Sequence, residues 1–131
     1  MWLLDTNVVI HAIRGDPPAV RARLIDVGPG AVRIASVTIA ELWYGALKSP
    51  HPKRRRDVFD AFLGPIETLP FDRAAAIHHA ELRYALRHTP IGVRDLLIAS
   101  IALSAGLGVV TNNRGEFQRV PGLVVEDWAS A

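Results

Sequence analysis

The chain contains no cysteine among its 131 residues. Disulfide bonds and thiolate metal sites are therefore excluded, and any metal ion must be held by oxygen atoms or imidazole nitrogens. Oxygen ligands favour hard ions such as Mg²⁺ and Mn²⁺. If the protein has a metal site, we expect carboxylates to supply most of it.

Lysine is scarce, because it occurs only at Lys48 and Lys53 within a total of 15 lysine and arginine residues. The positive charge is therefore almost entirely arginine. Arginine can bind phosphate through two parallel hydrogen bonds, which is compatible with a nucleic-acid partner. The formal net charge is only +2, and a GC-rich genome would produce the same arginine bias. Composition does not decide between these two explanations.

A long apolar run is also absent, since no uninterrupted apolar segment approaches the roughly 20 residues that a transmembrane helix needs. The N-terminal apolar stretch contains Asp5 and has no basic segment before it, unlike a secretory signal. We therefore expect a cytoplasmic protein. Hydrophobic residues make up 50% of the chain and charged residues 21%. This balance predicts one globular domain over residues 1–131.

Short apolar segments alternate with helical patterns along the chain. The expected strands cover residues 2–4, 32–35, 66–69, 108–111 and 123–125. The expected helices cover residues 6–13, 19–27, 36–48, 53–63, 73–88 and 93–105, with a short turn around 116–117. We expect Thr6 or Asn7 to cap the first helix, Asp72 to cap the fifth and Gly106 to end the sixth. This alternation predicts a three-layer α/β/α fold with a short, mostly parallel central sheet.

Asp5 directly follows the first expected strand. A carboxylate next to an apolar run must cap a helix, pair with another group or hold a metal ion. Capping is a serious possibility because a helix begins immediately afterwards. However, open α/β sheets bind ligands outside the carboxyl ends of their strands, which is where Asp5 is expected. For Asp5 alone both interpretations stay open.

Two further acids are expected near the same edge of the sheet. Glu41 completes a Thr38-x-x-Glu41 capping box, but it also lies in the first turn of the helix after the second strand. Asp95 lies in the first turn of a helix that carries no other charge beyond it. The helix dipole favours an acid there, yet an acid at the start of a buried helix also needs a partner.

Asp5, Glu41 and Asp95 come from three separate regions and together form a plausible cage for Mg²⁺ or Mn²⁺. Such an ion would activate water and neutralise charge on a phosphate. Glu116 stays undecided because its turn follows a strand end. Most other acids are expected in solvated loops, caps or helix faces.

Four segments, in order, resemble the successive motifs of PIN-domain toxins of the VapC type: residues 3–7, 36–45, 89–95 and 110–117. The resemblance spans Leu3 to Trp128. It implies a metal-dependent endoribonuclease, the toxin of a bacterial toxin–antitoxin pair, with Asp5, Glu41 and Asp95 as the catalytic, metal-binding acids.

Other positions of these motifs are expected to support the three acids. Thr6 and Thr111 resemble the family's hydroxyl residues that orient acids or water, and Asn7 completes the first motif. Asn113 stands where family members often have a fourth acid, so it supplies a carbonyl but no charge. Arg87 and Arg94 are candidates for RNA-phosphate contact, although both could be ordinary solvated arginines.

The resemblance also implies a substrate and partners. Family substrates are structured RNAs, commonly tRNA anticodon loops, and cleavage leaves 5′-phosphate and 3′-hydroxyl ends. Residues 89–92 and the ending 126–128 resemble the branch that cleaves initiator tRNA. A VapB-type antitoxin is expected to wrap the protein, with Trp43 and Tyr44 as candidates for its groove. Homodimerisation is a further expectation.

Two other functions would also place acids at these positions. A phosphatase with an aspartyl nucleophile would have a second acid two residues after Asp5, and Asn7 stands there instead. A non-catalytic RNA-binding or antitoxin-sequestering module, in which the acids only cap helices, stays open on the sequence.

Overall fold

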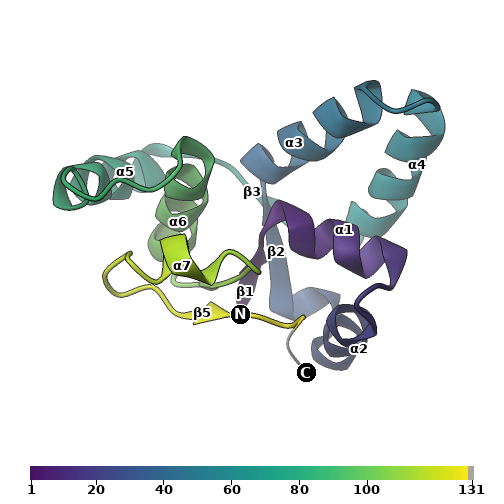
Figure 1. The fold of residues 1–131 in the computed structure, drawn as a ribbon, viewed down its shortest axis with the longest axis horizontal. Coiled ribbons are helices and arrows are strands. Elements are labelled where there is room, and N and C mark those ends of the chain that lie inside the picture. The colour runs from purple at the N-terminus through teal and green to yellow at the C-terminus, as the bar shows by residue number, and fades with distance from the viewer. Residues whose placement is uncertain (130–131) are drawn as a thin grey trace.

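A five-stranded sheet forms the centre of the computed structural model, which describes residues 1–129 (Figure 1). All pairings among the described strands are parallel, and their order is β3-β2-β1-β4-β5. The strands are β1 (Trp2–Leu4), β2 (Val32–Ala35), β3 (Glu67–Leu69), β4 (Gly108–Val110) and β5 (Val125–Glu126). The expected parallel sheet is confirmed.

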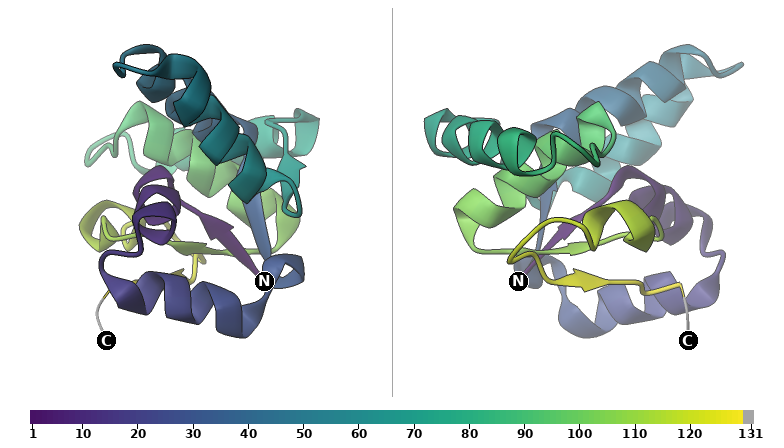
Figure 2. Two further views of the ribbon diagram at one scale, coloured as in Figure 1. Left: turned by 90° about the vertical axis from the view of Figure 1, so that its right-hand side faces the viewer. Right: turned by 60° about the vertical axis from the view of Figure 1, so that its left-hand side comes forward.

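Helices cover both faces of this sheet (Figures 1 and 2). On one side lie α1 (Thr6–Arg14), α2 (Pro18–Val27), the 3₁₀ helix η1 (Pro29–Ala31), α3 (Ser36–Leu47) and α4 (Pro52–Leu63). On the other side lie α5 (Arg73–Ala85), α6 (Val93–Ala105) and the short α7 (Arg114–Phe117). The three-layer α/β/α prediction is therefore confirmed. None of the helices in residues 1–129 is long and apolar enough to span a membrane.

Two apolar cores result from side chains that alternate across the strands. In β1, Leu3 packs into the core beneath α5 and α6, while Leu4 packs into the core beneath α1, α3 and α4. Both leucines are completely buried. The helix α6 is apolar nearly all round and buries Leu96 and every residue from Ile98 to Ala102. Gly106 ends α6 with a φ of 70°, as expected for a glycine after a helix.

The connections bring the carboxyl ends of β1 and β4 together at a point where the chain leaves the sheet toward opposite faces. After β1 the chain enters α1 on one face, whereas after β4 it enters α7 on the other. The backbone N–H of Asp5 donates to the carbonyl of Val110 over 2.9 Å, so Asp5 lies directly beside the end of β4. Such switch points are where open α/β sheets bind ligands.

Two helix starts differ from the sequence expectations. The expected capping box is wrong, because α3 begins at Ser36 directly from β2 and Ala35 offers no side-chain cap. Thr38 is therefore inside the helix, fully buried, with no hydrogen-bond partner for its hydroxyl. Glu41 lies in the second turn rather than the first. The first helix is capped by Asp5 itself, not by Thr6 or Asn7.

The remaining boundaries agree to within a few residues. Asp72 caps α5 as expected, since its side chain accepts from the backbone N–H of Ala75. The helix α5 ends at Ala85 rather than at His88, and the last strand is Val125–Glu126 rather than residues 123–125. These differences do not change the order of the elements or the edge of the sheet at which the acids meet.

Candidate active site

A cleft of about 420 Å³ lies at the carboxyl edge of the sheet. It is lined from α1, α3, α6 and the loop after β4, so it lies between the two helical layers. The three acids expected from the sequence all line it, together with most of their expected supporting residues. The lining residues are Asp5, Thr6, Asn7, Ile10, Glu41, Arg94, Asp95, Ile98 and Asn113.

A larger depression of about 810 Å³ lies elsewhere, at the turn between α3 and α4. Its lining includes one acid, Asp57, and that acid is paired with Lys53 over 3.1 Å. This depression therefore lacks the concentration of carboxylates that distinguishes the smaller cleft. The cleft that Asp5, Glu41 and Asp95 line is therefore the candidate active site.

Both oxygen atoms of the Asp5 carboxylate accept hydrogen bonds, and the residue is only 8% exposed. One oxygen, Oδ1, accepts from the backbone N–H of Thr6 over 2.8 Å. The other, Oδ2, accepts from the hydroxyl of Thr111 over 2.8 Å, and that hydroxyl in turn accepts from the backbone N–H of Asn113 over 2.9 Å. Asp5 is thus both a helix cap and a cleft residue. A carboxylate accepts more than two bonds, so it retains capacity for a further ligand.

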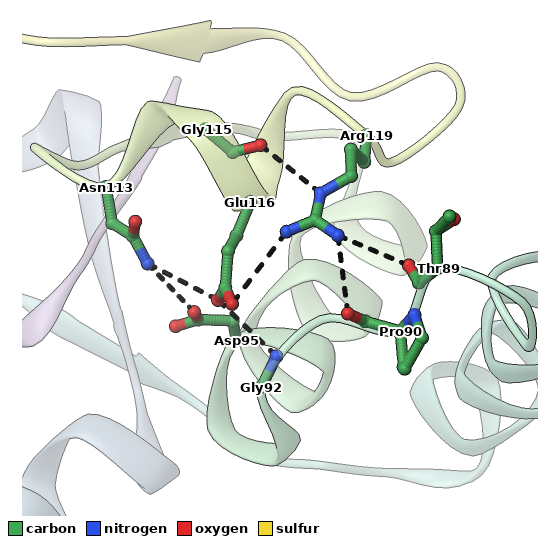
Figure 3. A network of polar contacts seen from close by, with 8 residues as sticks. All are labelled: Thr89, Pro90, Gly92, Asp95, Asn113, Gly115, Glu116 and Arg119. Carbon is green, nitrogen blue, oxygen red and sulfur yellow. Dashed lines mark hydrogen bonds and ion pairs between the residues drawn. The ribbon is translucent and has the colours of Figure 1, made fainter.

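The Asn113 side chain points toward the carboxylates of Asp95 and Glu116, which lie close to each other (Figure 3). The amide nitrogen of Asn113 donates to Asp95 Oδ2 over 3.1 Å and to Glu116 Oε2 over 3.4 Å. The backbone N–H of Gly92 also donates to Glu116 Oε2, over 3.4 Å. Asn113 therefore acts as a neutral donor between two acids. The sequence left the role of Glu116 undecided. Its position after the end of a strand was the feature that indicated a place near the other acids.

The proximity of these acids changes their protonation. Burial, followed by a hydrogen bond with Glu116, raises the pKa of Asp95 to about 7. The negative charge of Asp5 raises it further, while Arg94 acts in the opposite direction. The pKa of Glu116 lies below its ordinary value, chiefly because of its hydrogen bond with Asp95. The two carboxyl groups therefore titrate as a pair, with Asp95 as the group that is protonated more readily.

Glu41 faces a different partner. Its Oε2 atom accepts from the guanidinium of Arg94, which is on the first turn of α6. The side chain of Arg94 is 66% exposed and that of Glu41 is 30% exposed. Within residues 1–129, no three acid or histidine side chains converge closely enough to hold one ion in this arrangement. The third carboxylate of the expected cage is engaged by an arginine.

The oxygen atoms of the cleft are nevertheless of the kind that a hard divalent cation requires. Three carboxylates from separate segments line one cleft, and no sulfur or imidazole ligand lies among its lining residues. Burial is the main cause of the raised pKa of Asp95, but the negative charges of Asp5 and Glu116 also raise it, so several negative charges lie close together there. A divalent cation would neutralise that charge. The donor set fits Mg²⁺ or Mn²⁺.

A third arginine, Arg119, supports this arrangement and was not expected from the sequence. Its guanidinium donates to the carbonyls of Thr89 and Pro90 over 3.4 Å each and lies 4.0 Å from Glu116 Oε1 (Figure 3). It thereby ties the loop before α6 to α7. This loop leads directly to Asp95. Because Arg119 contacts both the loop and Glu116, it helps to hold Asp95 in position next to Glu116.

The two arginines that were expected to contact RNA, Arg87 and Arg94, lie at different places on the structure. Arg94 lines the cleft, as described. Arg87 does not, because it donates to the backbone carbonyl of Tyr84 over 2.8 Å and its guanidinium lies 4.0 Å from the centre of the Tyr84 ring. It contributes to a separate shallow depression on α5 with His79 and Arg83.

Comparison with known proteins agrees with this fold. The family model of the PIN domain matches residues 2–123. The chain is 44% identical to the tRNA(fMet)-specific endonuclease VapC of Shigella flexneri over 130 residues, 98% of each chain. Among solved structures, DNA-bound VapBC from Salmonella typhimurium has a TM-score of 0.89 at 43% identity, over 97% of each chain.

VapBC2 from Rickettsia felis, solved with a DNA fragment from its promoter, gives the same TM-score of 0.89 at 35% identity. It covers 97% of this chain and 98% of that chain. These likenesses extend over nearly the whole length of the protein. The chain therefore belongs to the PIN-domain family and, within it, to the VapC proteins.

Proposed function

We propose that the protein is a divalent-metal-dependent endoribonuclease and the toxin of a toxin–antitoxin pair. The observation that carries the proposal is that Asp5, Glu41 and Asp95 line one cleft from three separate segments. Full-length relatives named as VapC ribonucleases and tRNA(fMet)-specific endonucleases support the same activity.

Asp5, Asp95 and Glu41 are the residues that would hold Mg²⁺ or Mn²⁺, directly or through water. When bound, the ion would neutralise charge on the scissile phosphate and lower the pKa of a water molecule. The protein supplies the positions of these oxygens. Thr111 fixes Asp5 through its hydroxyl, and Asn113 fixes Asp95 through its amide.

In the metal-free cleft, the pair of Asp95 and Glu116 has one pKa raised to about 7 and the other lowered. A bound divalent cation would lower the pKa of Asp95 and keep its carboxylate ionised as a ligand. In-line attack of water on phosphorus breaks the bond to the 3′ oxygen. The products are then a 3′-hydroxyl end and a 5′-phosphate end.

The proposed substrate is a tRNA, including the initiator tRNA, cut in its anticodon loop. The support is the identity of 43–44% to relatives named as tRNA(fMet)-specific endonucleases. Arg94, at the cleft, is the better placed of the two candidate arginines for an RNA phosphate. Arg87 remains a candidate only for a more distant part of the RNA.

The proposed partner is a VapB-type antitoxin, as in the VapBC complexes that share this fold. Trp43 and Tyr44 on α3 are 43% and 59% exposed, which fits a role in that contact. We further propose that the protein forms a homodimer and acts in the cytoplasm, where its RNA substrate is found.

Sequencing of RNA ends after brief expression tests the activity and the substrate together. Wild-type protein is expected to produce one new 5′-phosphate end in a tRNA loop, and Asp95→Asn is expected to produce none. Asp57→Asn, which changes a solvated acid on α4, serves as the matched control and should cut as the wild type does. A wild type that produces no new RNA end would favour the non-catalytic alternative, and an active Asp5→Asn variant would show that Asp5 serves only as a helix cap.

A further inference from the structure

Glu41 differs from the other two cleft acids in the charge of its partner. Asp5 accepts hydrogen bonds from the neutral N–H of Thr6 and the neutral hydroxyl of Thr111. Asp95 accepts from the neutral amide of Asn113. Glu41 alone among the three accepts from a charged guanidinium, that of Arg94. Among the described residues, one of the three cleft carboxylates is thus already paired with a positively charged side chain of the protein.

The contact bridges two elements that enclose the cleft. Glu41 comes from α3 and Arg94 from the first turn of α6, and both residues line the cavity. Arg94 also acts on the neighbouring acid, since its charge counteracts the rise in the pKa of Asp95. The positive charge of Arg94 is therefore felt at two of the three acids. This is the place where a divalent ion is expected.

The Arg94 guanidinium takes up an acceptor position of Glu41 Oε2, and its positive charge repels a metal ion that approaches the same carboxylate. A divalent ion therefore binds Glu41 more favourably when Arg94 moves away from Oε2. The energy required is small, because the Arg94 side chain is 66% exposed and exposed ion pairs contribute little to stability. The pair is weak enough to be exchanged, yet it must still reduce the affinity of the site for the metal.

We propose that Arg94 is a built-in competitor of the divalent ion at Glu41. In the metal-free protein its guanidinium neutralises Glu41, and ion binding releases it toward the mouth of the cleft. Arg94 thereby sets the metal affinity of the site. The inference rests on the proposed metal-dependent function and adds to it a residue that regulates loading of the ion.

Direct titration with Mn²⁺ tests this inference. Free Mn²⁺ is followed by electron paramagnetic resonance in the presence of the purified full-length chain, without RNA or antitoxin. Arg94→Gln is expected to bind Mn²⁺ about two- to fivefold more tightly than the wild type, a gain of the size of one exposed ion pair. Arg56→Gln, which removes an exposed arginine from α4, is the charge-matched control and should bind as the wild type does.

A double-mutant cycle with Glu41→Gln shows whether the effect passes through Glu41. In the Glu41→Gln background, Arg94→Gln should change Mn²⁺ affinity less than it does in the wild-type background. An equal gain in both backgrounds would mean that Arg94 acts by general repulsion, and it would overturn competition at Glu41.

The remaining outcomes separate this inference from the proposed function. If the wild type binds Mn²⁺, Asp5→Asn weakens that binding and Arg94→Gln leaves it unchanged or weaker, competition by Arg94 is refuted and the metal site stands. If the wild type binds no Mn²⁺, the proposed metal site is refuted, and the role of Arg94 with it. Circular dichroism of Arg94→Gln confirms that the exposed substitution leaves the fold intact.

Discussion

At the scale of single residues, each oxygen of the Asp5 carboxylate has its own donor: the backbone of Thr6 for one and the hydroxyl of Thr111 for the other. Helix capping and a place in the cleft are therefore compatible, because a carboxylate has several acceptor positions. Thr111 is completely buried and also accepts from the backbone of Asn113. It links the strand end of Asp5 to the loop that carries Asn113.

Replacing Thr111 by valine should therefore be costly. Thr111→Val keeps the shape but leaves Asp5 Oδ2 and the N–H of Asn113 without their partner, which is expected to reduce the free energy of unfolding by about 1–3 kcal/mol. Urea denaturation measures this change. Thr68→Val, at an exposed position of β3, is the matched control and should be close to neutral. Equal losses for the two variants would show that the Thr111 hydroxyl does not hold Asp5.

The pKa of Asp95 predicts how stability depends on pH. Because its folded pKa is raised from 3.8 to about 7, its contribution to stability is present below pH 4 and is lost as the pH rises toward 7. The lowered pKa of Glu116 acts in the opposite sense, and its contribution is lost only as the pH falls below its ordinary 4.5. Between about pH 5 and 8 the effect of Asp95 should dominate.

Thermal unfolding in the presence of a chelator checks this expectation. The Tm of the wild type should fall more between pH 5 and pH 8 than the Tm of Asp95→Asn, which cannot ionise at that position. Groups that titrate elsewhere contribute equally to both proteins and cancel in the comparison. A decline of the same size in both would contradict the assignment.

The sequence predicted the three acids but not all of their partners. Asp5, Glu41 and Asp95 were identified by their positions after strands or at helix starts, and they line one cleft as expected. The ion pair of Arg94 with Glu41 and the meeting of Glu116 with Asp95 depend on how separate helices pack. Local patterns contain no information on such distances.

At the scale of elements, the clearest predictions came from residues with a strong backbone preference. The bounds of α6 were predicted correctly because its apolar run ends at Gly106, which adopts a left-handed φ of 70°. The start of α3 was predicted less well. Its true cap position holds Ala35, which marks no helix start, whereas Thr38 and Glu41 formed a plausible capping box inside the helix.

Gly106 offers a test of this backbone argument. Gly106→Ala should reduce the free energy of unfolding by about 1 kcal/mol, because alanine is disfavoured at positive φ while nothing lies within 4 Å of the added methyl group. Gly30→Ala is the matched control, since it also has open space but no positive φ. Chemical denaturation should show a clear difference between the two. Equal effects would mean that φ strain does not set the end of α6.

At the scale of the whole molecule, the C-terminal segment closes the fold against the N-terminal strand. The ring of Trp128 lies edge-on to Trp2 with centroids 6.2 Å apart, and its Nε1 donates to Glu126 over 2.9 Å. Arg23 of α2 lies over the same ring at 5.3 Å. The ending Glu126-Asp127-Trp128, which resembles a substrate-specific branch of the family, therefore has a packing role in this structure.

Removal of this ring should weaken the entire domain. Trp128→Ala is expected to lower the free energy of unfolding by about 3 kcal/mol or more, as is typical of large buried aromatic side chains. Trp128 is 5% exposed, whereas Trp43 is 43% exposed. Trp43→Ala is therefore the control and should cost well under half as much. Urea unfolding monitored by far-ultraviolet circular dichroism measures both, and similar costs would contradict the role of Trp128.

The three-layer architecture was predictable because short apolar strands alternate with helices, which is typical of parallel sheets covered on both faces. The order of the strands was not predicted from that alternation. It arises from the packing of α1 on one face and of α5 and α6 on the other, which places β1 between β2 and β4. That arrangement brings Asp5 and Thr111 side by side.

The most direct test of the proposed function is cleavage of purified initiator tRNA by the purified protein, with Mg²⁺ or Mn²⁺ and with a chelator. Wild-type protein should cut in the anticodon loop only when a divalent ion is present. Asp5→Asn should reduce the initial rate by roughly a hundredfold or more. Cleavage that persists in the chelator, or an Asp5→Asn variant as fast as the wild type, would contradict a metal-dependent nuclease centred on Asp5.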